Sequence, residues 1–248
     1  MKTYCISDIH GRYNALRQLL TETPFNIDND RLIVLGDVVD GGCKTRQCFD
    51  LLLTVPNRVD ILGNHDYPWA YDWMTKGIEL PVWTHQGGLA TMGSYYFDWK
   101  SVPRAHIDYI ENMLPYWVDE KNNLYVHGGF NPKVPIENQK TEFLTWDRTI
   151  IKYARAHTIK DYNHVFVGHT TTQIIDRAVM YPLTFHNLTM MDTGAGWKGR
   201  LSLINVDTLE YWVSDLQTPY YEPTDDDGSN DTEEEAWAAG MVSFEIPR

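Results

Sequence analysis

Short runs of β-branched and aromatic residues recur along this chain, and five of them end directly in a cluster of Gly, Asp, Asn and His residues. Such runs are typical of strands. In open α/β sheets the carboxyl ends of parallel strands meet at one edge, where ligands bind. The pattern therefore predicts a sheet whose strand ends carry one polar site. The five clusters are Asp8-Ile9-His10-Gly11, Gly36-Asp37-Val38-Val39-Asp40, Gly63-Asn64-His65-Asp66, His127-Gly128-Gly129 and Gly168-His169-Thr170.

Helical patterns separate the early runs. Residues Tyr13–Thr21 and Thr45–Leu53 each place their leucines on one face, as an amphipathic helix does. Strand alternating with helix predicts a layered α/β fold with much parallel pairing. We expect antiparallel strands within Leu188–Asp215 and helices and loops over residues 67–117, at one end of the sheet. The strands expected from the runs are Thr3–Ser7, Arg31–Leu35, Arg58–Leu62, Leu124–Val126, His164–Val167, Leu188–Met191 and Leu201–Val206.

Negative charge gathers at the end of the chain. The 248 residues carry a net charge of −13, and the segment from Leu201 onward has 12 acids against one base, Arg248. We expect a catalytic domain over residues 1–218 and an acidic, partly disordered tail over residues 219–248. A general nucleic-acid binder normally presents a basic face, so binding to DNA or RNA at large is disfavoured.

The cysteines and the hydropathy indicate a cytoplasmic protein, in the host cytoplasm if the source is a phage. Three cysteines, Cys5, Cys43 and Cys48, form neither a disulfide framework nor a paired zinc pattern. The first residues lead straight into a predicted strand without a signal peptide. No apolar run approaches the ~20 residues that a membrane span needs, so no membrane partner is expected. The oligomeric state is left open.

The five clusters together indicate metal chemistry, although each one alone is more often a turn than a site. Their carboxylate, amide and imidazole donors include no thiolate and suit manganese, iron or zinc better than calcium. Two divalent ions with two carboxylates leave a net positive site that accepts a phosphate dianion and activates a water for in-line attack on phosphorus. His65 has the right chemistry to protonate the leaving oxygen, and Asp40 could orient it.

These motifs, in this order over residues 3–213, resemble the calcineurin-like metallophosphoesterases. The nearest branch is the bacterial and phage serine/threonine phosphatases, with the symmetrical diadenosine tetraphosphatases close by. The resemblance implies a β-sandwich core of mixed sheets flanked by helices, with the active site at the carboxyl ends of strands. It implies that Asp8 and His10 hold the first of two divalent ions, manganese before iron or zinc. It further implies that Asp37 bridges the ions, that Asn64, His127 and His169 hold the second, and that His65 acts as the acid with Asp40.

The same resemblance indicates a clamp for the substrate phosphate. Residues Leu144–Arg148 are similar to a family segment whose arginine grips phosphate, which implies that role for Arg148 beside Asn64. Met191–Ala195 is similar to the family's late Asp-Thr-Gly turn. The branch usually has a second arginine where this chain has Gly41. Arg12, Lys44 and Arg46 are the nearby bases, and we interpret each of them as an ordinary surface charge.

Three functions remain open. The first is a phosphatase of serine and threonine phosphoproteins. The second is a hydrolase of diadenosine polyphosphates or another nucleotide, favoured by Asp66 in its motif and by Gly41. The third, least favoured because every expected ligand and His65 are present, is a binder of phosphorylated ligands without catalysis. Aromatic residues near the motifs could stack on a nucleobase, but core or lid packing is the default interpretation for Trp69, Trp73, Trp83, Trp99 and Tyr71.

Overall fold

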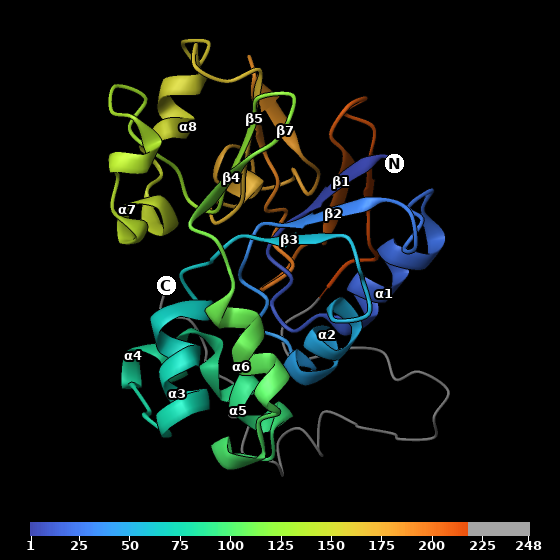
Figure 1. Ribbon diagram of the computed structural model, residues 1–248, viewed down its shortest axis with the longest axis vertical. Coiled ribbons are helices and arrows are strands. Elements are labelled where there is room, and N and C mark those ends of the chain that lie inside the picture. The colour runs from blue at the N-terminus through green and yellow to red at the C-terminus, as the bar shows by residue number, and fades with distance from the viewer. Residues whose placement is uncertain (218–248) are drawn as a thin grey trace.

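The computed structural model describes residues 1–217, and two five-stranded sheets stand at its centre (Figure 1). The predicted tail, residues 219–248, lies outside the described residues. The first sheet has the order β10-β9-β1-β2-β3, and the second has the order β4-β5-β6-β8-β7. The strands are β1 (Thr3–Ile6), β2 (Arg31–Val34), β3 (Arg58–Asp60), β4 (Tyr116–Val118), β5 (Asn123–Val126), β6 (His164–Val167), β7 (Leu183–Phe185), β8 (Leu188–Met190), β9 (Ser202–Asn205) and β10 (Tyr211–Val213).

The two sheets pack face to face, because alternate residues of each strand point to opposite sides. Cys5 and Ile33 of the first sheet share one buried cluster with Tyr125 and Phe166 of the second. The rings of Tyr125 and Phe166 stack with centroids 5.2 Å apart. The intervening residues, such as Ile6, pack instead into a core shared with the helices. The expected α/β fold with a β-sandwich core of mixed sheets is thereby confirmed.

Each sheet contains three neighbouring parallel strands and two antiparallel ones. Strands β1, β2 and β3 run parallel, as do β5, β6 and β8. Strands β9 and β10 are antiparallel additions, as expected for the region after residue 200. The expectation was wrong for β8, which pairs in parallel with β6 and in antiparallel fashion only with β7. The three parallel strands of each sheet therefore end on the same side.

Helices cover the outer faces of the sheets and build a separate lobe. Helices α1 and α2 pack on the first sheet, and α3 to α6 gather beside it at the bottom of Figure 1. Helices α7 and α8 flank the second sheet. The α-helices are α1 (Tyr13–Glu22), α2 (Thr45–Leu52), α3 (Tyr71–Lys76), α4 (Pro81–Trp83), α5 (Leu89–Ser94), α6 (Arg104–Glu111), α7 (Thr141–Trp146) and α8 (Thr149–Ala154). Short π or 3₁₀ turns are η1 (Asp66–Ala70), η2 (Thr84–Gly88), η3 (Trp99–Ser101), η4 (Ile136–Asn138) and η5 (Thr172–Ile174).

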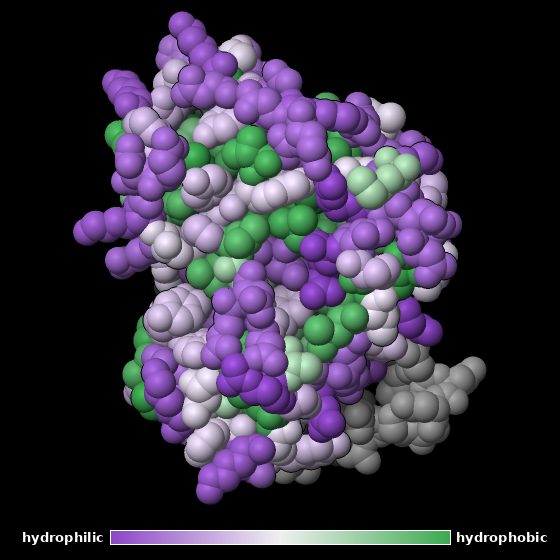
Figure 2. Space-filling view, viewed as in Figure 1, coloured by the Kyte–Doolittle hydropathy of each residue, from purple (hydrophilic) through white to green (hydrophobic). Residues whose placement is uncertain are grey.

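The lobe of α3 to α6 is fastened to helix α2 by polar contacts as well as by apolar packing. His106 of α6 is hydrogen-bonded to the Tyr95 hydroxyl (2.8 Å) and to Asp50 of α2 (2.9 Å). Phe49 stacks on the same imidazole. The lobe thus has a fixed position beside the strand ends. Figure 2 shows hydrophilic residues over most of one face of the molecule, with hydrophobic residues in smaller groups between them. Within residues 1–217, no helix has the length and apolar character to cross a bilayer.

Candidate functional site

The carboxyl ends of the two sheets bring the sequence clusters together. Asp8 and Asp37 follow β1 and β2, and His127 and His169 follow β5 and β6. Three expected ligands leave their strands through a left-handed backbone, with φ of +50° at His10, +48° at Asp37 and +61° at His169. Residues other than glycine rarely adopt this conformation, and it is concentrated at functional sites. The strand ends thus turn sharply enough to aim these side chains into one centre.

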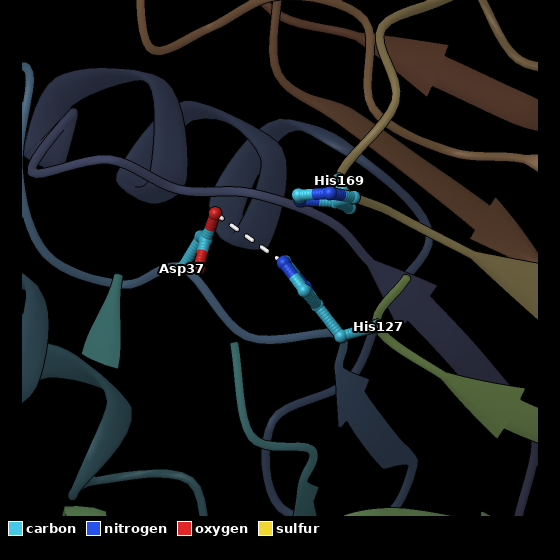
Figure 3. Close-up of side chains that lie close together, drawn as sticks. All are labelled: Asp37, His127 and His169. Carbon is cyan, nitrogen blue, oxygen red and sulfur yellow. Dashed lines mark ion pairs between the residues drawn. The ribbon is translucent and has the colours of Figure 1, made fainter. Parts of the chain in front are cut away.

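Two groups of metal-ligating side chains share Asp37. Asp8, His10 and Asp37 form one group, and Asp37, His127 and His169 form the other. Within each group the ligand atoms lie within 4.8 Å of one another. Figure 3 shows the second group, in which His127 Nε2 lies 3.4 Å from Asp37 Oδ2. On the other side, His10 Nε2 lies 3.7 Å from the same oxygen. Asp37 is therefore common to both groups and lies between His10 and His127.

The histidines are oriented as metal ligands are. His127 Nδ1 lies 2.6 Å from the Leu35 carbonyl oxygen, and His10 Nδ1 lies 3.0 Å from that of Val39. The carbonyl oxygen accepts a hydrogen bond from Nδ1–H, which leaves the lone pair on Nε2, facing the centre. His169 Nε2 is buried and has no hydrogen-bond partner among the described residues. The donor set therefore fits two divalent cations, each held by oxygen and nitrogen atoms.

The pKa shifts of Asp37 and His127 also indicate a site for cations. Burial opposes the charge of Asp37, but the surrounding histidines outweigh it and hold the pKa of this carboxyl well below its usual range. Burial likewise disfavours the charged form of His127, yet Asp37 raises the pKa of His127 to about 10. The Asp37 carboxylate thus stabilises a positive charge next to His127 Nε2. A metal cation at this position would supply that charge in place of the proton on Nε2. Asn64, 1% exposed, places its Oδ1 3.0 Å from the same nitrogen.

His65 and Asp40 form a buried pair beside the metal groups. His65 Nδ1 lies 2.7 Å from Asp40 Oδ2, and the His65 ring packs edge to face with that of His10. Burial lowers the pKa of His65, but the charges of Asp37 and Asp40 and the hydrogen bond outweigh it and raise this pKa to about 9. An imidazolium held in this way can deliver a proton at neutral pH.

Two residues that the sequence did not single out for this site complete the surroundings of Asp40. The indole Nε1 of Trp83 donates to Asp40 Oδ2 (2.8 Å), and the hydroxyl of Thr91 donates to Oδ1 (2.7 Å). Both come from the helical lobe and are fully buried. The core-packing interpretation of Trp83 is correct but incomplete, because its indole also fixes the carboxylate. Neither residue belongs to a motif. The one signal in the sequence was a single polar residue among the apolar residues of the lobe.

Asp66 is a third residue whose structural role the sequence left unassigned. Its carboxylate accepts hydrogen bonds from the backbone N–H groups of Asp37 (2.7 Å), Val38 (3.0 Å) and Gly63 (3.1 Å). It therefore joins the loop after β2 to the loop after β3. The motif Gly63-Asn64-His65-Asp66 contained the signal, since an Asp in a tight loop commonly bonds to nearby backbone.

Arg148 lies at the edge of the centre. One terminal guanidinium nitrogen donates to the His169 carbonyl (3.1 Å) and to the Thr170 hydroxyl (2.9 Å). The side chain remains exposed. It is thus anchored beside a candidate metal ligand with part of its guanidinium facing solvent, as a residue that binds an anion requires.

Gly41 has no room for the arginine found elsewhere in the branch. Its φ is +81°, and a Cβ there would meet the Gly196 carbonyl oxygen at 2.8 Å. The interpretation of Arg12 as a surface charge was wrong. Arg12 is fully buried and donates to the carbonyl oxygens of Ala195 (3.0 Å) and Gly196 (3.4 Å). Its guanidinium therefore supports the turn that lies against Gly41.

Comparison with known proteins agrees with this geometry. The family model described as calcineurin-like phosphoesterase matches residues 1–188. A symmetrical bis(5'-nucleosyl)-tetraphosphatase of Buchnera aphidicola is 34% identical over 145 residues, which are 56% of this chain and 48% of that protein. The chain thus spans about half the length of the curated relatives that it matches.

Solved structures share the fold at low sequence identity. A protein assigned provisionally as a diadenosine tetraphosphatase has a TM-score of 0.66 at 18% identity, covering 90% of this chain and 95% of the other. A serine/threonine phosphatase of Saccharomyces cerevisiae has a TM-score of 0.58 at 13% identity, covering 90% and 81%. The family model covers most of the described residues. The fold of this chain and the metal-ligating side chains at its strand ends agree with that match. The chain belongs to the calcineurin-like phosphoesterase family.

Proposed function

We propose that this protein is a metal-dependent hydrolase of phosphoric esters or anhydrides. The observation that carries the proposal is the pair of ligand groups that share Asp37, with His65 and Asp40 directly beside them. A binder without catalysis would need the ligands but not a buried imidazole whose charge is maintained by two carboxylates. The proposed general acid, His65, is therefore what distinguishes a hydrolase from a binder without catalysis.

Six side chains would hold the two ions. Asp8 and His10 would bind one, Asn64, His127 and His169 the other, and Asp37 both. When bound, two divalent ions supply an activated water and neutralise charge on the phosphate. We place manganese first among the metals, with iron and zinc as alternatives, because the donors are oxygen and imidazole nitrogen.

The chain's own residues would position the substrate and move the proton. Arg148 would bind phosphate oxygens with the guanidinium nitrogens that do not face Thr170, and the Asn64 amide would contact the same phosphate. His65 would donate its proton to the leaving oxygen. Asp40, held by Trp83 and Thr91, would keep the imidazole charged and aligned.

We place dinucleoside polyphosphates first among the substrates, ahead of the phosphoproteins that the sequence alone favoured. The supporting observation is the tetraphosphatase of Buchnera aphidicola at 34% identity. Phosphoserine and phosphothreonine proteins are the second candidate, supported by the segment that carries Arg148 beside the centre. The yeast serine/threonine phosphatase supports the fold alone at its 13% identity.

The proposal is tested by offering manganese-loaded protein diadenosine tetraphosphate, phosphopeptides, cyclic nucleotides and RNA ends, and by identifying the products. We expect diadenosine tetraphosphate to be split into two molecules of ADP. His65→Asn should keep its manganese and lose about 10²–10⁴-fold in kcat, the usual contribution of a general acid. His157→Asn, at an exposed histidine beyond α8, should match the unaltered protein. Hydrolysis of no substrate in this panel, or full turnover by His65→Asn, would contradict the proposal.

A further inference from the structure

A chain of aromatic rings borders the centre. Trp69 of η1 packs edge to face with His65, with ring centroids 5.9 Å apart. Trp69 also meets Trp146, the last residue of α7, at 5.6 Å and an interplanar angle of 72°. Trp146 in turn packs edge to face with His169 at 5.6 Å. Two tryptophans from opposite sides of the site thus connect the proposed acid to a candidate metal ligand.

Trp146 differs from the buried indoles of the helical lobe, whereas Trp69 is partly buried against the core. Trp73 and Trp83 are 1% and 0% exposed, as core packing requires, whereas Trp146 is 40% exposed. Leaving this much of an indole in water forgoes burial of apolar surface. Arg148, two residues further on, is exposed as well and is anchored to His169 and Thr170. A cation and an aromatic ring therefore stand together at the edge of the site.

The position of the rings indicates which part of a substrate would meet them. His65, as the proposed acid, faces the leaving oxygen, and Trp69 touches His65 directly. Aromatic pairs associate with ring centroids about 4.5–7 Å apart. A flat ring attached to the leaving group could therefore contact Trp146 while the phosphate stays between Arg148 and the metal ligands. A phosphoserine side chain offers no such ring.

We propose that this site selects substrates whose leaving group carries a flat aromatic ring, which stacks on Trp146 while Trp69 holds that indole in place. The proposal rests on the proposed function, because the leaving side is defined by His65. The ring is either the nucleobase of a nucleotide or the phenyl ring of an aryl phosphate. Both have the same stacking chemistry, and the arms of the test distinguish them.

The test measures binding of two pairs of ligands to the manganese-loaded protein by calorimetry. Phenylphosphonate and methylphosphonate differ by a ring next to phosphorus and cannot be hydrolysed at their P–C bond. ADP and pyrophosphate differ by the adenosine. We expect the unaltered protein to prefer the member with the ring by about tenfold in at least one pair, within the range measured for stacking of bases on aromatic side chains. The pair with the larger preference identifies the source of the ring.

Substitutions assign that preference to the indole. Trp146→Leu should abolish the preference and leave the affinity for methylphosphonate and pyrophosphate within about twofold, and Trp146→Tyr should retain most of it. The control is Tyr211→Leu in the exposed ring pair Tyr181–Tyr211, which lies on the sheet edges. If Trp146→Leu lowered the affinity for both members of a pair equally, the role of Trp146 would be merely structural and the subsite would be overturned. A protein without any ring preference would overturn it too. Ring-selective binding without hydrolysis would contradict the proposed function and leave the subsite standing.

Discussion

His164, at the start of β6, is a half-buried histidine outside the candidate site. Its Nε2 lies 2.7 Å from the Thr189 hydroxyl, and its ring packs on that of Phe166. Burial lowers the pKa of His164 to about 4. The unfolded chain, with an ordinary pKa near 6.5, binds the proton first. The stabilisation contributed by neutral His164 is therefore complete above about pH 6.5 and is lost as the pH falls towards 4.

We predict that His164→Gln makes stability less sensitive to acid, because glutamine can bond to Thr189 but does not titrate. Thermal unfolding followed by circular dichroism at pH 7, 6 and 5 should show the melting temperature of the unaltered protein falling more steeply than that of the variant. His157→Gln, at an exposed position, should keep the steeper slope. Parallel slopes for His164→Gln and the unaltered protein would exclude this histidine as a source of acid sensitivity.

The residues around Asp40 mark the limit of what the sequence predicts at this scale. Asp40 and His65 lie in Gly-containing motifs at strand ends, so their proximity follows from the parallel sheet. Trp83 and Thr91 reach the same carboxylate from helices 43 and 51 positions further along the chain. Nothing local distinguishes an indole that donates to a carboxylate from one that only fills a core. Their role depends on how the lobe docks on the sheet, which is a tertiary property.

At the scale of elements, the strands with strong hydrophobic runs are predicted well. The predicted run Arg31–Leu35 corresponds to β2, Arg31–Val34, and His164–Val167 is identical to β6. Strands β4 and β7 went unpredicted, because three residues at a sheet edge have few neighbours to impose an alternating pattern. The parallel pairing of β8 was missed because its connection to β6 contains the short turn η5 and strand β7 in place of the usual crossover helix.

The loops after β2 and β3 act together through Asp66, whose carboxylate accepts three backbone N–H groups. We predict that Asp66→Asn weakens manganese binding by about 10–100-fold, the usual effect of removing a partner that orients metal ligands. An amide oxygen cannot accept all three bonds as well as a carboxylate, so Asp37 loses its fixed position. Calorimetric titration with manganese measures the affinity. Asp72→Asn removes a carboxylate that pairs with Lys76 within α3 and should bind manganese normally. Equal affinity in both variants would refute the role of Asp66.

At the scale of the molecule, the candidate metal centre lies where the two sheets meet. Asp8 and Asp37 extend from the first sheet, and His127 and His169 extend from the second. The protein already connects the sheets there, since the His169 N–H donates to Asp8 Oδ1 (2.9 Å) and His127 Nδ1 lies 2.6 Å from the Leu35 carbonyl oxygen. Cations bound to these side chains would therefore join the sheets at their carboxyl ends, where buried carboxylates otherwise lie close together.

Manganese should accordingly stabilise the whole described domain as well as support chemistry. A ligand at 100 times its dissociation constant stabilises the folded state by about 2.7 kcal/mol, and each kcal/mol shifts the melting temperature of a domain of this size by roughly 2–4 °C. We therefore predict a rise of roughly 5–10 °C over chelator-treated protein in differential scanning calorimetry. His127→Ala should lose most of this rise, because it removes a ligand from the second sheet, while His157→Ala should keep it. If manganese left the melting temperature unchanged although calorimetric titration showed it to bind, the ions would not join the sheets, and their contribution would be confined to the reaction.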